Sequence, residues 1–110
     1  MKGLVMKILF LIPLLLPLPA LATDADYTLV INEHRFQPAE ITIPSGKKIK
    51  LMIVNRDATP EEFDSFALNR EKVIVGQGTA IVYIGPLDAG RYEFMGEFHA
   101  STAQGVINAR

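Results

Sequence analysis

The chain has no cysteine in its 110 residues. Without disulfides a small domain has to depend on its hydrophobic core alone. The absence also excludes thiol catalysis, zinc–thiolate sites, iron–sulfur clusters and covalently attached haem, all of which need cysteine. A blue-copper centre, which binds its ion through a thiolate, is excluded on the same ground.

The chain also has little clustered positive charge beyond Lys47, Lys48 and Lys50, whose spacing is typical of the solvated face of a strand. Counted without residues 1–22, nine Lys and Arg stand against twelve Asp and Glu, a net charge of −3. Nucleic-acid binding needs a basic surface, so no nucleic-acid partner is expected. The chain has no glycine-rich phosphate loop, and neither Ser65 nor Ser101 lies in a GxSxG nucleophile motif.

The first segment has the pattern of an export signal. Two lysines precede an apolar run over residues 8–18, and the small-x-small sequence Ala20-Leu21-Ala22 is typical of a cleavage site. Prolines interrupt the run, which is shorter than the ~20 apolar residues of a membrane-spanning helix. We therefore predict a signal peptide over residues 1–22 and a single periplasmic domain over residues 23–110, without stable membrane insertion after cleavage. An uncleaved N-terminal anchor is the alternative.

The rest of the chain alternates between short β-forming runs and turn residues such as Ser45-Gly46. About seven short strands with frequent turns predict an all-β fold, a Greek-key antiparallel β-sandwich. The expected core residues are Leu29, Ile31, Phe36, Ile41, Ile43, Leu51, Ile53, Val82, Ile84, Tyr92, Phe94 and Val106.

Residues 56–72 are the longest stretch without strand periodicity. Thr59 can cap a helical turn in which Pro60 is the first residue and acidic residues follow. A loop of this length in so small a domain is usually functional or disordered.

The last part of the chain offers metal-binding side chains. By alternation Tyr92 and Phe94 share one face of a strand, and Met95 and Glu97 share the other. His99 follows in a loop of small residues. Imidazole is the commonest metal ligand, a thioether suits soft copper, and carboxylates suit iron, manganese and oxidised copper. The structural alternatives are a surface histidine and a methionine that fills a gap in the core.

Two further segments extend this hypothesis. Among Glu61, Glu62 and Asp64 the choice of ligand is open; we favour Glu62, although a solvated helix N-terminus explains all three acids equally well. His34 is an outer candidate if the loop after the first strand lies near the His99 loop. The predicted metal ligands are His99, Met95, Glu97, Glu62 and His34.

The pattern Tyr92-x-Phe94-x-Gly96-x-x-His99…Gly105 resembles the C-terminal signature of the cupredoxins. In that signature a cysteine stands where this chain has Gly96, and a histidine matches His99. Ala103 lies about where the axial methionine is found, and residues 61–63 occupy the segment that presents the other histidine. One of the four usual ligands therefore matches and three do not, so the resemblance implies the cupredoxin-like fold without the blue-copper ligand set.

A closer resemblance is to cysteine-free periplasmic cupredoxin-like proteins, which are similar to the N-terminal cupredoxin domain of EfeO-type iron-uptake proteins. The matching stretches are His34-Arg35-Phe36-x-Pro38, residues 60–65, residues 69–74, residues 84–87 and Gly96-Glu97-Phe98-His99-x-x-Thr102-Ala103-Gln104-Gly105. The resemblance implies a copper or iron ion as cofactor and a role in high-affinity ferrous iron uptake, by iron oxidation or electron transfer. It also implies an iron permease or a second periplasmic metal-binding protein as partner.

Two alternatives stay open. The first is a metal-free adaptor that docks on a membrane permease or periplasmic partner, with Glu61-Glu62-Phe63 as its interface. The second is an enzyme, a ferroxidase that turns over with oxygen. The sequence leaves open whether the protein is an enzyme.

Overall fold

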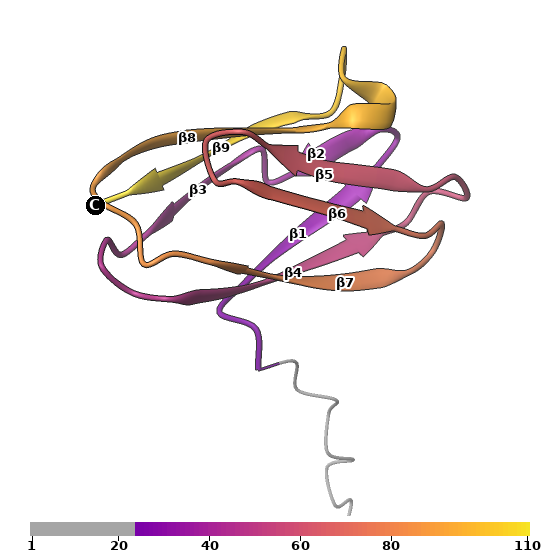
Figure 1. The fold of residues 1–110 in the computed structure, drawn as a ribbon. Helices are drawn as coiled ribbons and strands as arrows, with labels where there is room; N and C mark the ends of the chain where they lie inside the picture. The colour runs from indigo at the N-terminus through magenta and orange to yellow at the C-terminus, as the bar shows by residue number, and fades with distance from the viewer. Residues whose placement is uncertain (1–23) are drawn as a thin grey trace, which may run out of the picture.

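The computed structural model describes residues 24–110, which form two β-sheets packed face to face (Figure 1). The predicted signal peptide lies outside these residues. Among them, no helix has the length and apolar character needed to cross a membrane.

The smaller sheet has four strands in the order β2-β1-β4-β7. β1 and β4 pair in parallel, and the other two pairs are antiparallel. Its strands are β1 (Tyr27–Asn32), β2 (Arg35–Gln37), β4 (Ile49–Asn55) and β7 (Thr79–Ile84).

The larger sheet has five strands in the order β3-β9-β8-β5-β6, and only its β3–β9 pair is parallel. A short 3₁₀ helix, η1 (Glu97–His99), follows β8 directly. The strands are β3 (Glu40–Ile43), β5 (Glu61–Ser65), β6 (Arg70–Ile74), β8 (Gly90–Gly96) and β9 (Gln104–Ala109).

The predicted all-β sandwich is confirmed, with two differences of detail. The described residues form nine strands instead of about seven, and two of the strand pairs are parallel. The extra strands are short or polar, like the three-residue β2, and therefore leave a weak alternation in the sequence.

The expected helical turn at Thr59 is wrong. Residues 61–74 form the hairpin β5–β6, in which Glu61 pairs with Ile74 and Ser65 with Arg70. Glu61, Phe63 and Ser65 are the buried residues of β5, so polar side chains occupy two of its three inward positions. Strand periodicity read from hydrophobicity misses such a strand.

The core lies between the sheets and contains nine of the twelve expected residues. Ile41 and Tyr92 are only partly buried, and Val106 is buried on the outer face of β9, outside this core. Its centre is an aromatic cluster in which the Phe63 and Phe94 rings lie 5.0 Å apart, and the Phe36 and Phe94 rings 4.9 Å apart. Phe63 is completely buried. The adaptor hypothesis is therefore wrong in making it part of an exposed interface.

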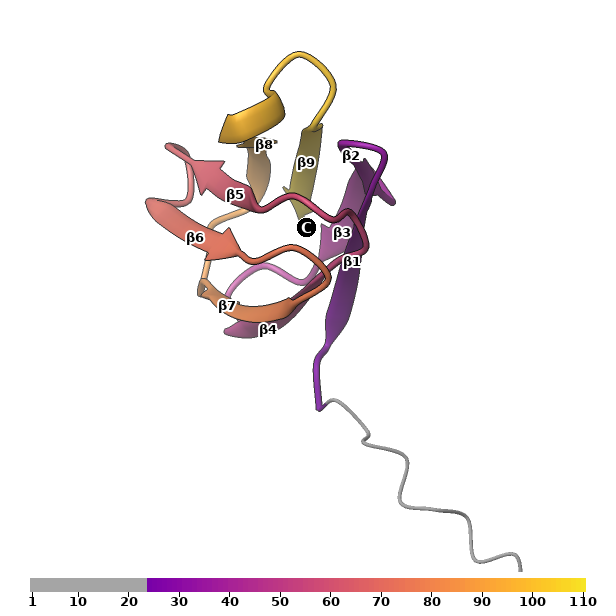
Figure 2. The same cartoon turned by 90° about the vertical axis from the view of Figure 1, so that its right-hand side faces the viewer.

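Both views place η1 and the β1–β2 turn at the same end of the sandwich (Figures 1 and 2). The Thr102 hydroxyl, in the loop after η1, donates a hydrogen bond to the His34 carbonyl in that turn, at 2.6 Å. The Phe98 amide of η1 donates to the Glu61 carboxylate of β5, at 2.9 Å. The fold thus brings three distant segments of the chain together at this end.

Candidate metal site

A cluster of three potential metal ligands lies at this end of the sandwich. His34 lies in the β1–β2 turn, Glu61 begins β5 and His99 ends η1. One ligand atom from each of these residues lies within 4.8 Å of the others. Two imidazoles and one carboxylate therefore converge from three separate segments.

Glu61 forms the buried base of the cluster, with only 1% of its surface exposed. Its Oε1 accepts hydrogen bonds from the amides of Phe98 and Glu62, at 2.9 and 3.0 Å. Its Oε2 lies 2.6 Å from His99 Nδ1. A buried carboxylate needs such donors, because an unpaired charge in the interior is costly. Because the amides hold Oε1, Oε2 is the oxygen that faces the histidines.

Gly96, which has no side chain, leaves the room that this carboxylate occupies. A Cβ atom at Gly96 would lie 2.6 Å from Glu61 Cδ and 2.7 Å from the Cβ of Ala103. Both distances are far below ordinary contact distance, so a larger residue at position 96 would displace both Glu61 and Ala103. Ala103 itself is completely buried.

The two imidazole rings stack on one another above Glu61. Their centroids lie 3.6 Å apart and their planes differ by 10°. The side chains of His99 and His34 are 28% and 42% exposed, so the cluster opens to solvent on its histidine side. His99 is held by its contact with Glu61 and by the Ala103 amide, which donates to its carbonyl at 2.8 Å.

The cluster has the ligand types of a transition metal site, and its ligand atoms, within 4.8 Å of one another, are slightly farther apart than one ion requires. Metal bonds to nitrogen and oxygen of about 2.1 Å allow two donors of one ion to lie at most ~4.2 Å apart, so small movements suffice. The nearly parallel rings cannot both direct a lone pair at one point, so one ring has to rotate, and the exposure of His34 leaves room for that. A set without thiolate or thioether suits oxidised copper, iron or zinc, and it does not fit a blue-copper centre.

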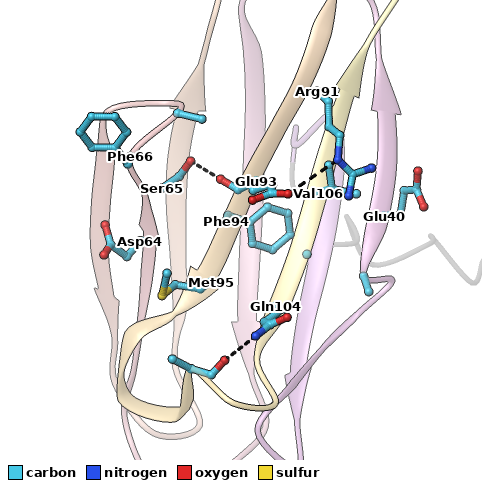
Figure 3. A pocket seen from close by; sticks show the side chains of 14 residues that line it. Glu40, Asp64, Ser65, Phe66, Arg91, Glu93, Phe94, Met95, Gln104 and Val106 are labelled. Atoms are coloured by element: carbon cyan, nitrogen blue, oxygen red, sulfur yellow. Dashed lines mark hydrogen bonds and ion pairs between the residues drawn. The ribbon is translucent and has the colours of Figure 1, made fainter.

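The structure brings together two of the five predicted ligands, His34 and His99, with Glu61, one of the acids left open. Met95 is 42% exposed and lies beside the groove on the outer face of β8 (Figure 3). It alternates along β8 with Gly96, the residue that contacts the buried Glu61. Glu62 likewise alternates with Glu61 along β5. Strand alternation therefore places Met95 and Glu62 on the face opposite the histidines.

Glu97 is exposed on η1 and belongs to the same outer acidic surface as Glu62. Partial desolvation, followed by the charges of Glu97, Glu71 and Asp64, raises the pKa of Glu62 above its ordinary value. A groove beside this surface is lined by Asp64, Met95 and the fully exposed Phe66, among others (Figure 3). These carboxylates crowd one another on the outer face, outside the His34–Glu61–His99 cluster.

The sequence favours Glu62 as a ligand, whereas the structure places its neighbour Glu61 in the cluster. One signal was available: Glu61 and Phe63 are two residues apart, so in a strand an inward Phe63 places Glu61 inward as well. The lack of hydrophobic alternation in residues 56–72 conceals that relation.

The chain is similar to proteins with cupredoxin folds. A search of solved structures finds amicyanin from Paracoccus versutus, with 18% identity, a TM-score of 0.63 and coverage of 80% of this chain and 83% of that one. Auracyanin from Roseiflexus castenholzii has 12% identity and a TM-score of 0.63, covering 76% and 95%. A purple cupredoxin from Nitrosopumilus maritimus has 16% identity and a TM-score of 0.59, covering 77% and 100%. At these identities the likeness establishes the fold alone.

A curated relative lies closer in sequence. The protein named Uncharacterized protein RP394, from Rickettsia prowazekii, is 42% identical over 82 residues, which is 74% of this chain. The match spans 66% of that protein, slightly less than two thirds of its length. Residues 5–109 match the family described as cupredoxin-like domain. This chain therefore belongs to the cupredoxin-like domain family.

Proposed function

We propose that this domain binds a transition metal ion through His34, Glu61 and His99. The observation that carries the proposal is a carboxylate, 1% exposed, whose Oε2 faces two imidazoles within 4.8 Å. Among residues 24–110, no lysine or arginine forms an ion pair with Glu61. A cation held between these groups would neutralise the buried charge and replace the proton that His99 shares with it.

We further propose that the ion is copper or iron. Histidine nitrogens and a carboxylate oxygen suit oxidised copper and iron, while the lack of sulfur ligands disfavours reduced copper. Either ion would supply one-electron redox chemistry when bound. The chain supplies a fixed negative charge at Glu61, a rigid imidazole at His99 and a more exposed imidazole at His34, the side open to solvent.

The wider role that we propose is support of high-affinity ferrous iron uptake in the periplasm, by iron oxidation or electron transfer, with an iron permease or a periplasmic metal-binding protein as partner. Its support is the sequence resemblance to cysteine-free cupredoxin-like proteins and to EfeO-type iron-uptake proteins. The export pattern of residues 1–22 is consistent with this location. The metal-free adaptor is less well supported, because Phe63 is buried in the core.

Calorimetric titration with Cu(II), and with Fe(II) under anaerobic conditions, tests metal binding. We expect one ion per chain, and an affinity reduced about tenfold or more in Glu61→Gln and in His99→Ala. Glu62→Gln is the matched control, since it removes the neighbouring carboxylate on the opposite face of the same strand and should leave the affinity unchanged. Absence of binding by the parent protein, or equal losses in Glu61→Gln and Glu62→Gln, would contradict the proposed site.

Ferrous oxidation with the copper-loaded protein tests the redox role separately. Oxygen consumption faster than that of the same concentration of free copper would support catalysis of iron oxidation. A rate equal to that of free copper would contradict a ferroxidase function and would be consistent with a protein that only carries the metal.

A further inference from the structure

The β1–β2 turn that presents His34 has an unfavourable backbone. Glu33 and His34 have φ angles of 53° and 59°, in the left-handed region that favours glycine. The side chain of Asp57, from the loop after β4, compensates for this. Its Oδ1 accepts the Glu33 amide at 2.8 Å, and its Oδ2 accepts the His34 amide at 2.9 Å.

The same carboxylate faces the imidazole of His34. Asp57 Oδ2 lies 3.3 Å from His34 Nδ1, within ion-pair distance. Nδ1 is buried, and among residues 24–110 it has no aligned hydrogen-bond partner. At this distance, rotation of the ring can align an Nδ1 proton with Oδ2. One of the two stacked rings also has to rotate before both histidines can bind the same ion.

Asp57 is itself held in place. Its side chain is 14% exposed, and its amide donates to the side-chain oxygen of Asn55 at 3.0 Å. Asn55 is buried and donates to the carbonyls of Thr59 and Ile74, at 2.9 and 3.2 Å. The Asp57 carbonyl accepts the Gln77 amide at 2.9 Å. The carboxylate therefore sits on a rigid, hydrogen-bonded support.

We propose that Asp57 is a positioning residue of the metal site, which holds the proton of His34 on Nδ1 and leaves Nε2 as the nitrogen that binds the ion. This inference rests on the proposed metal-binding function. A carboxylate behind a metal-bound histidine fixes the tautomer and orientation of the ring, and its loss typically reduces metal affinity 10–100-fold. The structure couples this role to the turn, because one side chain serves both the backbone and the ring of His34.

The test begins with the metal-free protein. Nitrogen-15 spectra of the His34 ring, recorded above the pH at which imidazole titrates, report which nitrogen carries the proton. We expect the Nδ1–H form in the parent, and a shift towards the Nε2–H form in Asp57→Asn. Asp64→Asn, which changes an aspartate on the outer face, should leave the His34 spectrum unchanged. A parent in the Nε2–H form, or a spectrum insensitive to Asp57→Asn, would overturn the inference.

Metal affinity is the second readout. Asp57→Asn should weaken Cu(II) binding about 10–100-fold, and it should add no further loss in a His34→Ala background. The Glu33→Gly background relieves the strained turn, so Asp57→Asn can be measured there if the single variant folds poorly. An equal loss with and without His34 would mean that Asp57 acts through stability alone. A parent that binds no Cu(II) would overturn the proposed function, whereas the ring spectrum would still decide whether Asp57 positions His34.

Discussion

The contact between Gly96 and Glu61 yields a prediction whose size can be worked out from the structure. Gly96 has φ −93° and ψ 110°, an extended conformation that alanine adopts without strain. Any effect of Gly96→Ala is therefore steric. The new Cβ would lie 2.6 Å from Glu61 Cδ and 2.7 Å from Ala103 Cβ, so the buried carboxylate has to move.

Two terms set the magnitude. Forcing an extra methyl group into a packed interior costs about 1–3 kcal/mol. Moving Glu61 also weakens its charge-assisted hydrogen bonds from Phe98 and Glu62, each of which contributes about 1.5–3 kcal/mol. If part of those bonds is lost, Gly96→Ala should reduce the free energy of unfolding by about 2–5 kcal/mol. That is a large share of the ~5–15 kcal/mol typical of a domain.

Urea unfolding followed by circular dichroism measures this loss, and Gly90→Ala is the matched control. Gly90 lies at the other end of β8, and a Cβ there would meet Tyr92 at an ordinary 3.6 Å. We expect Gly90→Ala to be neutral or slightly stabilising. In a Glu61→Ala background the added cost of Gly96→Ala should be clearly smaller than in the parent. Equal stability of the two glycine variants, or additive effects of Gly96→Ala and Glu61→Ala, would refute the reasoning.

Three further predictions concern the core and the two shifted carboxylates. Phe63→Ala should cost about 3–5 kcal/mol in urea unfolding because Phe63 is fully buried, whereas Phe66→Ala at the exposed hairpin tip should cost almost nothing. Partial desolvation and neighbouring carboxylates, Glu97 first, raise the pKa of Glu62, so its ionisation opposes folding. Glu62→Gln should therefore be more stable than the parent at about pH 7 and lose this advantage towards about pH 4; a gain independent of pH would contradict this. Partial burial acts to raise the pKa of Asp57, but the amides and imidazoles that it faces outweigh this and lower it below 3.8. Ionised Asp57 therefore stabilises the fold above pH 3.8, and this contribution is lost as the pH falls through the lowered pKa. The difference in free energy of unfolding between the parent and Asp57→Asn should therefore shrink in acid.

The predictable parts of the fold are the strands in which apolar and polar residues alternate. The faces of β8, with Phe94 inward and Met95 outward, follow from period-two patterning. The parallel pairing of β1 with β4 does not, because pairing between distant strands leaves no local pattern. β5 was missed because Glu61 and Ser65 occupy inward positions where a hydrophobic pattern expects apolar residues.

The candidate site was predictable in its chemistry and only partly in its residues. His99 could be found from its place after a strand, and His34 from its residue type, although their stacking depends on tertiary structure. Closeness in sequence links Met95 to His99, yet Met95 lies on the exposed outer face of β8. The burial of Glu61 depends on the space left by Gly96, and such a contact between distant segments cannot be read from either segment alone.

The most direct test of the central claim is a crystal structure of the copper- or iron-loaded protein with anomalous diffraction measured at the metal's absorption edge. We predict one strong anomalous peak between His34, Glu61 and His99, at about 2.0–2.2 Å from their nitrogen and oxygen atoms. A peak on the outer face beside Glu62, Met95 and Glu97, or no peak in crystals soaked to saturation, would contradict the account.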